Sequence, residues 1–225
     1  MNASTDGTPS VRVWDLPTRL FHWALAVLIA LQYATGEFGL LDMDWHYRFG
    51  YAILALVAFR ILWGFAGSQT SRFADFLRGP AVVLRHMRAY FYKNPQSYVG
   101  HNPPGGWSVL AMLACVLVQA LSGLFASDEI TEQGPFADRV GEKTMRLLTR
   151  VHDWNQNVLL ALIALHVVAV LLHLLLKHDN LILPMLSGRK PLAGAPALRF
   201  VSGWRALLLL GVCAAAVVAL AWYAG

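Results

Sequence analysis

Eight histidines are the residues of this 225-residue chain best suited to chemistry. Three of them, His152, His166 and His173, lie in one long apolar segment. Placing an imidazole in lipid is costly unless the ring faces a partner, so each histidine calls for a function. His152 and His166 are 14 residues apart, which is almost four helical turns, so they share one helix face about 21 Å apart along the axis.

The elements that must carry these histidines are membrane spans. The chain is 57% hydrophobic and only 14% charged, against about 45–50% and about 25% in soluble domains. A helix needs about 20 apolar residues to cross the hydrocarbon core. Five segments qualify, and they run over about 17–39, 45–66, 107–126, 151–177 and 204–224. We expect the first to be a retained anchor and not a cleaved signal.

Alternating spans place four histidines in two pairs. His22 lies near the start of span one, and His46 and His152 lie near the starts of spans two and four. We therefore expect His46 beside His152 (the outer pair) and His22 beside His166 (the inner pair). Two imidazoles between helices of a bundle can hold a six-coordinate haem iron. The pairing predicts two haem b groups and an all-α membrane protein, a four-helix transmembrane haem-binding bundle plus a fifth transmembrane helix.

Two arginines and two glycines have spacings that suit a macrocycle. Arg60 follows His46 by 14 residues, and Arg19 precedes His22 by three, so both could pair with haem propionates. Gly36 and Gly50 lie at the depth of the outer pair and would let a flat ring approach the backbone. The alternative for these glycines is helix packing.

The remaining histidines have plainer interpretations. His173 is the main rival to His166, two turns further along the same face, but it would lie near the membrane surface. We expect His86 to face lipid headgroups and His101 and His178 to be solvated. For each membrane histidine taken singly, a hydrogen bond between helices is the alternative to metal ligation.

Charge predicts the orientation. One side holds the N-terminus and the connections 67–106 and 178–203, and it carries 13 of the 18 basic residues with 4 of the 13 acidic residues. The other side carries 5 basic and 9 acidic residues, so the two sides have net charges of +9 and −4. By the positive-inside rule the N-terminus is cytoplasmic and the C-terminus periplasmic. Within the first side, residues 72–92 mix aromatic and basic residues at helical spacing, which predicts a helix lying on an anionic leaflet.

Several classes of protein fit poorly. Cys115 and Cys213 form no disulfide framework, zinc motif or c-type haem attachment. The net charge of +5 follows the membrane sides, so no nucleic-acid partner is expected. A proton or metal-ion transporter would make the histidine pairing a coincidence, and proline is absent from the middle of every span. A haem-free membrane anchor would be colourless.

Several motifs together resemble a known family. The run from Val13 to Trp23 (VWDLPTRLFHW), the run from Gly100 to Trp107 (GHNPPGGW) and His178-Asp179-Asn180 are similar to the bacterial cytochrome b561 and nickel-dependent hydrogenase b-type cytochrome family. The resemblance covers about residues 11–190. It implies a four-helix, two-haem core in residues 1–190, with ligands at His22, His46, His152 and His166. The linker and span of residues 191–225 depart from that pattern, and we expect them to serve packing, dimerisation or partner docking.

The resemblance also implies a function. Members pass electrons between membrane quinone and a partner such as a hydrogenase, a dehydrogenase or a c-type cytochrome. We expect this role in a bacterial inner membrane, where the protein contacts lipid and could form a homodimer. No side chain is expected to be catalytic. Gln119 could bind a quinone carbonyl, although a hydrogen bond between helices is the stronger interpretation. Superoxide oxidation with quinone reduction is an alternative. The outer charge of −4 disfavours it, whereas the cluster Arg139, Lys143, Arg146 and Arg150 keeps it open.

Overall fold

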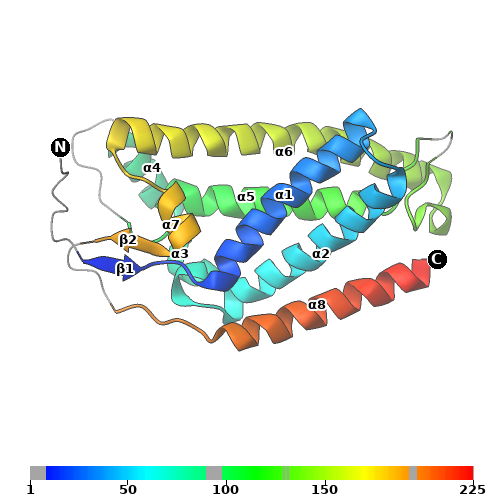
Figure 1. The fold of residues 1–225 in the computed structure, drawn as a ribbon. Helices are drawn as coiled ribbons and strands as arrows, with labels where there is room; N and C mark the ends of the chain where they lie inside the picture. The colour runs from blue at the N-terminus through cyan, green and yellow to red at the C-terminus, as the bar shows by residue number, and fades with distance from the viewer. Residues whose placement is uncertain (1–8, 90–97, 129, 131, 193–196, 225) are drawn as a thin grey trace.

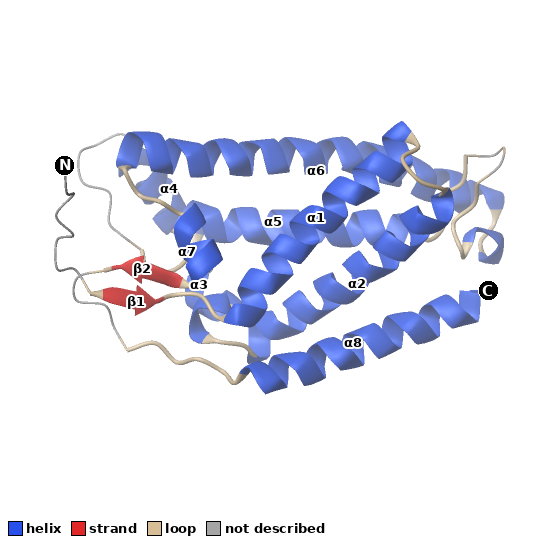
Figure 2. Ribbon diagram, viewed as in Figure 1, coloured by secondary structure: helices blue, strands red, loops and turns tan. Residues whose placement is uncertain are grey.

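The computed structural model describes residues 9–89, 98–128, 130, 132–192 and 197–224. In these ranges the chain is almost entirely helical (Figures 1 and 2). The long helices are α1 (Leu16–Phe38), α2 (Met43–Ala66), α5 (Pro103–Gly123), α6 (Glu142–Lys177) and α8 (Gly203–Ala224). The short elements are β1 (Ser10–Arg12), η1 (Gln69–Ser71), α3 (Phe73–Phe76), α4 (Pro80–Ala89), η2 (Ala137–Arg139), α7 (Ile182–Ser187) and β2 (Arg189–Pro191).

The predicted all-α membrane architecture is confirmed. Within the described residues, α2, α5, α6 and α8 are long and apolar enough to cross a membrane. The helix α1, the first of the five predicted spans, is long enough at 23 residues, but it has no stretch as apolar as those of these four helices. Its sequence includes Arg19, His22, Gln32 and Glu37, which lower its hydropathy. This helix nevertheless carries a predicted ligand, His22.

The long helices pack in a fixed order. The helix α1 packs along α2, α2 packs along α5 and α8, and α5 packs along α6. The fifth helix, α8, lies on α2 on the side away from α6 (Figure 1). Over the described residues, α1 and α6 are not a closely packed pair, and the side chains between them make the contact. This arrangement places a histidine of α1 opposite one of α6.

The helices begin where capping chemistry allows. Asp15 precedes α1 and accepts a 2.8 Å hydrogen bond from the backbone N–H of Thr18, and Asp42 caps α2 in the same way. Asn102 caps α5 through the N–H of Gly105 at 2.8 Å. The helix α5 begins at Pro103, four residues before the predicted span over 107–126, because prolines are well tolerated in the first turn of a helix.

Two helical boundaries differ from expectation. The helix α6 begins at Glu142, nine residues before the predicted span, because residues 142–150 continue the helix beyond the apolar stretch and Arg146 pairs with Glu142. The segment predicted as one helix over 72–92 is divided into α3 and α4 by Leu77 to Gly79. The helix α4 buries none of its residues. Residues 90–92 of that prediction lie outside the described residues.

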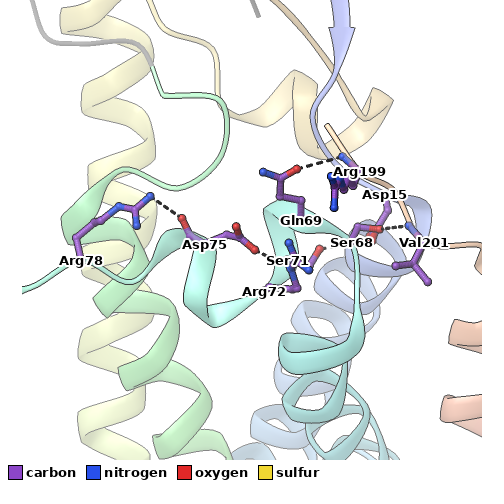
Figure 3. A network of polar contacts seen from close by, with 9 residues as sticks. All are labelled: Asp15, Ser68, Gln69, Ser71, Arg72, Asp75, Arg78, Arg199 and Val201. Atoms are coloured by element: carbon purple, nitrogen blue, oxygen red, sulfur yellow. Dashed lines mark hydrogen bonds and ion pairs between the residues drawn. The ribbon is translucent and has the colours of Figure 1, made fainter. Parts of the chain in front are cut away.

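A polar network ties together the end of the bundle at which α1 and α8 begin (Figure 3). Asp15 is fully buried and accepts hydrogen bonds from the indole N–H of Trp63 at 3.1 Å and from Ser71 at 3.5 Å. Ser68 accepts from the N–H of Val201 at 3.1 Å, which fixes the chain just before α8. The sequence analysis does not anticipate the short antiparallel pair of β1 and β2. This pair joins the segment before α1 to the segment after α7.

The elements expected on one side of the membrane lie at one end of the bundle. The pair of strands, α3, α4 and α7 lie together at one end, and the turn between α1 and α2, η2 and the end of α8 lie at the other (Figure 1). Arg139 of η2 donates to the carbonyl of Tyr223 at 3.0 Å and so holds the end of α8 against the second end. The sorting of charge inferred from alternating spans is therefore also a sorting in space.

Candidate functional site

The inner pair is brought together as predicted. The imidazole centres of His22 and His166 lie 6.4 Å apart, with ring planes inclined by 56°. Two bonds from a metal ion to imidazole nitrogen of about 2 Å each, with about 1 Å from each nitrogen to its ring centre, add to about 6 Å. The separation therefore fits two axial ligands of one metal ion. The Nδ1 atom of His22 is buried without a hydrogen-bond partner in the described chain.

The outer pair is also close, and each ring has polar neighbours. His46 and His152 lie near enough for their charges to interact. The Nδ1 atom of His46 lies 3.1 Å from the hydroxyl of Thr35 on α1. The Nδ1 atom of His152 lies 3.0 Å from the carbonyl of Gln119 and 3.3 Å from the hydroxyl of Ser122, both on α5. In both histidines the Nε2 atom is left for another ligand.

A glycine lies directly against each outer ring. A Cβ added to Gly36 would lie 2.9 Å from Cε1 of His46, and one added to Gly123 would lie 2.8 Å from Cε1 of His152. Both distances are shorter than real Cβ contacts allow. The sequence indicates Gly36 as a position where a macrocycle could approach the backbone, and the structure places this glycine against the imidazole of His46. Gly50 faces Gln32 of α1, at 3.5 Å from an added Cβ.

Arg60 is a buried cation near His101, at the end of the bundle that holds the inner pair. It is only 2% exposed, and its Nη1 atom has no hydrogen-bond partner in the described chain. Its guanidinium lies 5.4 Å from the ring centre of Phe73. Asp15 is near enough to attract it but lies beyond ion-pair distance, since no Arg60–Asp15 bridge forms among the described residues. An unpartnered buried guanidinium suits an acidic ligand group.

Arg19 is turned away from the inner pair. Its Nη1 atom donates to the carbonyl of Leu186 in α7, and its guanidinium lies against Gly188. The Nε atom is buried without a partner in the described chain. The predicted pairing of Arg19 with a propionate stays a prediction, whereas its contact with α7 is what the structure contains.

The expectation that His101 is solvated is wrong. Its ring lies between those of Trp14 and Phe76, with centres 4.8 Å and 4.7 Å away. Burial, with the nearby charge of Arg60 and then of His166 and His22, lowers the pKa of His101 to about 3. The sequence hides this because Trp14 and Phe76 reach His101 only after the chain has folded.

The other three histidines lie near the same end of the bundle. His86 lies against Tyr98, with a 3.3 Å contact between Nδ1 and the tyrosine hydroxyl, and its predicted contact with headgroups stays a prediction. His173 contacts the side chain of Asn102 at 3.3 Å, and so lies at the cap of α5 and not opposite His22. His178 ends α6 in an exposed left-handed conformation with a φ of 52°, as expected for a solvated residue.

Gln119 makes the hydrogen bond between helices that the sequence analysis favours. Its side-chain oxygen accepts from Asn155 of α6 at 2.7 Å, and the same amide of Asn155 also donates to the carbonyl of Cys115 at 2.8 Å. This contact lies less than one turn from His152 along α6. It helps to fix the rotation of α6 relative to α5, and so the direction of that histidine.

Sequence reasoning missed Thr35, Ser122 and Gly123. A signal was available, because Gln32 to Gly36 (QYATG) and Gln119 to Gly123 (QALSG) share the pattern Gln-x-x-Thr/Ser-Gly. Each copy lies at the end of a helix that is followed by a helix with an outer histidine. The pattern is short, and only the packing of α1 with α2 and of α5 with α6 shows its relation to the histidines.

The fold and the site define a membrane helix bundle with two pairs of facing histidines at two depths. The prokaryotic cytochrome b561 family model matches residues 13–188, and the chain belongs to this family. It is a membrane b-type cytochrome, and a b-type cytochrome carries haem b. The match ends before α8, which is outside the family pattern.

Curated relatives point the same way. A probable Ni/Fe-hydrogenase B-type cytochrome subunit of Azotobacter chroococcum is 25% identical over 213 residues, covering 80% of this chain and 88% of the relative. A protein of the same name from Cupriavidus necator is 23% identical over 218 residues, covering 83% and 89%. No solved structure matches the chain.

Proposed function

We propose that this protein is a dihaem cytochrome b that carries electrons across the inner membrane between quinone and a periplasmic redox partner. The observation that carries the proposal is the presence of two histidine pairs at two depths, with the inner rings 6.4 Å apart. Haem b supplies one-electron redox chemistry. The side chains of the bundle hold it, orient it and set its potential.

His22 and His166 would ligate the inner haem, and His46 and His152 the outer one. The ring separation of the inner pair supports the first assignment. The second is supported by the polar contacts at Nδ1, since a ring bonded through Nδ1 has Nε2 free. If two imidazoles held each haem iron, no position would remain open for oxygen, which suits electron transfer.

Arg60 would hold a propionate of the inner haem. It is buried, cationic and has an unpartnered Nη1 atom. Burial of a charge without a partner is costly, and an acidic ligand group would remove that cost. Arg19, at the same end of the bundle, is a second candidate, but its guanidinium already contacts α7.

The charge distribution supports an orientation and a kind of partner. The end of the bundle holding β1, β2 and α4 is strongly basic and would face the cytoplasm. The other end has a net charge of −4, which suits a partner with a basic docking surface. Because the relatives are named as hydrogenase B-type cytochrome subunits, a periplasmic hydrogenase is the partner we favour.

The superoxide alternative loses support in the structure. It depends on a positive funnel made by Arg139, Lys143, Arg146 and Arg150. Arg146 is paired with Glu142, and Arg139 stacks on Tyr223 with 4.6 Å between guanidinium and ring centre. Two of the four cations are therefore engaged elsewhere, and we do not adopt this function.

A reduced-minus-oxidised visible spectrum of the purified full chain, with haem counted per chain, tests the proposal. We expect a b-type spectrum, two haems per chain and reoxidation of the reduced protein by a quinone analogue. Absence of a b-type signal, or one haem in place of two, would contradict it.

A further inference from the structure

We infer that the two copies of Gln-x-x-Thr/Ser-Gly, Gln32 to Gly36 on α1 and Gln119 to Gly123 on α5, are matched imidazole cradles that position the outer histidines and lower the potential of the outer haem. The inference rests on the proposed function, because it needs a haem between His46 and His152. It adds positioning residues that touch only the imidazoles.

The cradle on α5 determines which nitrogen of His152 carries the proton. The Nδ1 atom lies 3.0 Å from the carbonyl oxygen of Gln119. A carbonyl can only accept, so Nδ1 must be the protonated nitrogen and Nε2 must hold the free lone pair. The hydroxyl of Ser122 donates to the carbonyl of Val118 at 2.7 Å, which leaves its oxygen as a second acceptor for the same N–H at 3.3 Å.

The cradle on α1 does the same for His46. The hydroxyl of Thr35 lies 3.0 Å from the carbonyl of Leu31 and 3.0 Å from that of Gln32. Its single proton is used there, so towards His46 it can only accept, and the 3.1 Å contact requires an N–H at Nδ1. The carbonyl of Gln32 is also in reach of the His46 ring, as that of Gln119 is for His152.

The glycine of each copy completes the cradle. With no Cβ, Gly36 and Gly123 leave room for the Cε1–Nδ1 edge of the imidazole against the helix, and any other residue would place a carbon within 3 Å of the ring. Each outer ring is therefore confined by a glycine on one edge and bonded through Nδ1 on another. Both contacts are made by the Nδ1–Cε1 edge of the ring, whereas Nε2 lies further from the glycine, at 4.0 Å from the added Cβ for His46 and 3.7 Å for His152.

A hydrogen bond donated from Nδ1 makes the coordinating nitrogen a stronger electron donor. A stronger donor stabilises the oxidised metal more than the reduced metal, which lowers the potential. The inner pair lacks the same support at His22, whose buried Nδ1 has no partner in the described chain. The cradles thus distinguish the two haems by their surroundings although the ligand type is the same.

The test is a redox titration of the haem-loaded full chain. Thr35→Val and Ser122→Ala remove the hydroxyls, whereas Thr35→Ser and Ser122→Thr keep a hydroxyl at each position. In the Thr35→Val, Ser122→Ala double variant we expect the potential of the outer haem to rise by about 59 mV, which is a tenfold change in a one-electron redox equilibrium. The potential of the inner haem should not change. In the variants that keep a hydroxyl, the potential of the outer haem should equal that of the wild type.

Tyr33→Phe is the matched control, because it removes a hydroxyl from the same helix at a side chain whose ring makes an edge-to-face contact with Phe38. The signal of the outer haem is identified by its loss in His46→Ala. Two haems with an unchanged outer potential in the double variant would overturn this inference alone. A wild-type protein with fewer than two haems would overturn the proposed function as well.

Discussion

The outer and inner histidine pairs use the same side chain in two different surroundings. His46 and His152 are held by neutral groups, a hydroxyl and a backbone carbonyl at each Nδ1. His22 has no partner at Nδ1 in the described chain, and the same end of the bundle holds a buried cation, Arg60, near His101. The comparison teaches that the ligands alone do not distinguish two haems, whereas hydrogen bonds at one depth and charge at the other can.

Both effects would separate the two potentials in the same sense. A donated hydrogen bond at Nδ1 lowers the potential of the outer haem. A buried positive charge near a haem favours its reduced form and so raises the potential of the inner one. The protein would thus obtain two different redox centres from four equivalent ligands.

Removing a ligand should have the largest effect. In His166→Ala we expect loss of the inner haem, so that the haem content falls from two to one per chain, while His173→Ala keeps both. The reason is that His166 faces His22, whereas His173 contacts Asn102. Haem counting with a visible spectrum checks this. Loss of a haem in His173→Ala with both retained in His166→Ala would mean that the inner pair is wrongly assigned.

Filling the glycine positions should weaken the outer site only. In Gly36→Ala or Gly123→Ala the new Cβ would lie within 3 Å of an outer imidazole and would displace it. We expect retention of the outer haem to fall by about tenfold, the usual size of effects on groups that orient metal ligands. Competition with apomyoglobin for haem measures this.

Gly211→Ala is the control for the glycine variants, since nothing lies within 4 Å of an added Cβ there. An equal loss from both haems would show a general disturbance of the bundle, and the comparison between the two pairs would then lose its basis.

Replacing Arg60 should change the inner potential without removing the haem. In Arg60→Gln we expect that potential to fall, by about tenfold in the redox equilibrium or about 59 mV, because the buried positive charge is gone. Arg60→Lys keeps the charge and should retain most of the value, although it loses the planar fork. If a redox titration showed a change in the potential of the outer haem instead, the assignment of Arg60 to the inner haem would be wrong.

The smallest effect concerns acid stability at the inner end. The folded chain keeps His101 neutral down to about pH 3, whereas the unfolded chain protonates it below about pH 6.5. The unfolded state therefore binds more protons in that window, and stability contributed by this residue is lost as the pH falls below about 6.5. When the pH is lowered from 7 to 5, the thermal midpoint of His101→Phe should fall less than that of the wild type.

The exposed residue His178 provides the control for that measurement. His178→Asn keeps a residue that tolerates its left-handed conformation and should leave the pH dependence unchanged. An identical pH dependence in His101→Phe and the wild type would show that His101 does not titrate with folding.

The helices and the inner pair could be predicted because their cause is local. Apolar length defines a span, alternation of spans sets depth, and the 14-residue step from His152 to His166 follows from helix geometry. The contact of His101 with two aromatic rings and the contact of Arg19 with α7 could not. They depend on which segments meet after packing, such as Trp14 and Phe76 with His101, and no local pattern contains that information.

By itself, the sequence determined that this is a helical membrane protein with histidines at two depths and opposite charge at its two ends, because hydropathy, helical period and charge are additive along the chain. Only the tertiary structure decided how each histidine is supported. The repeated Gln-x-x-Thr/Ser-Gly became two cradles because α1 packs against α2 and α5 against α6, which brings each hydroxyl within 3.3 Å of an imidazole from the next long helix.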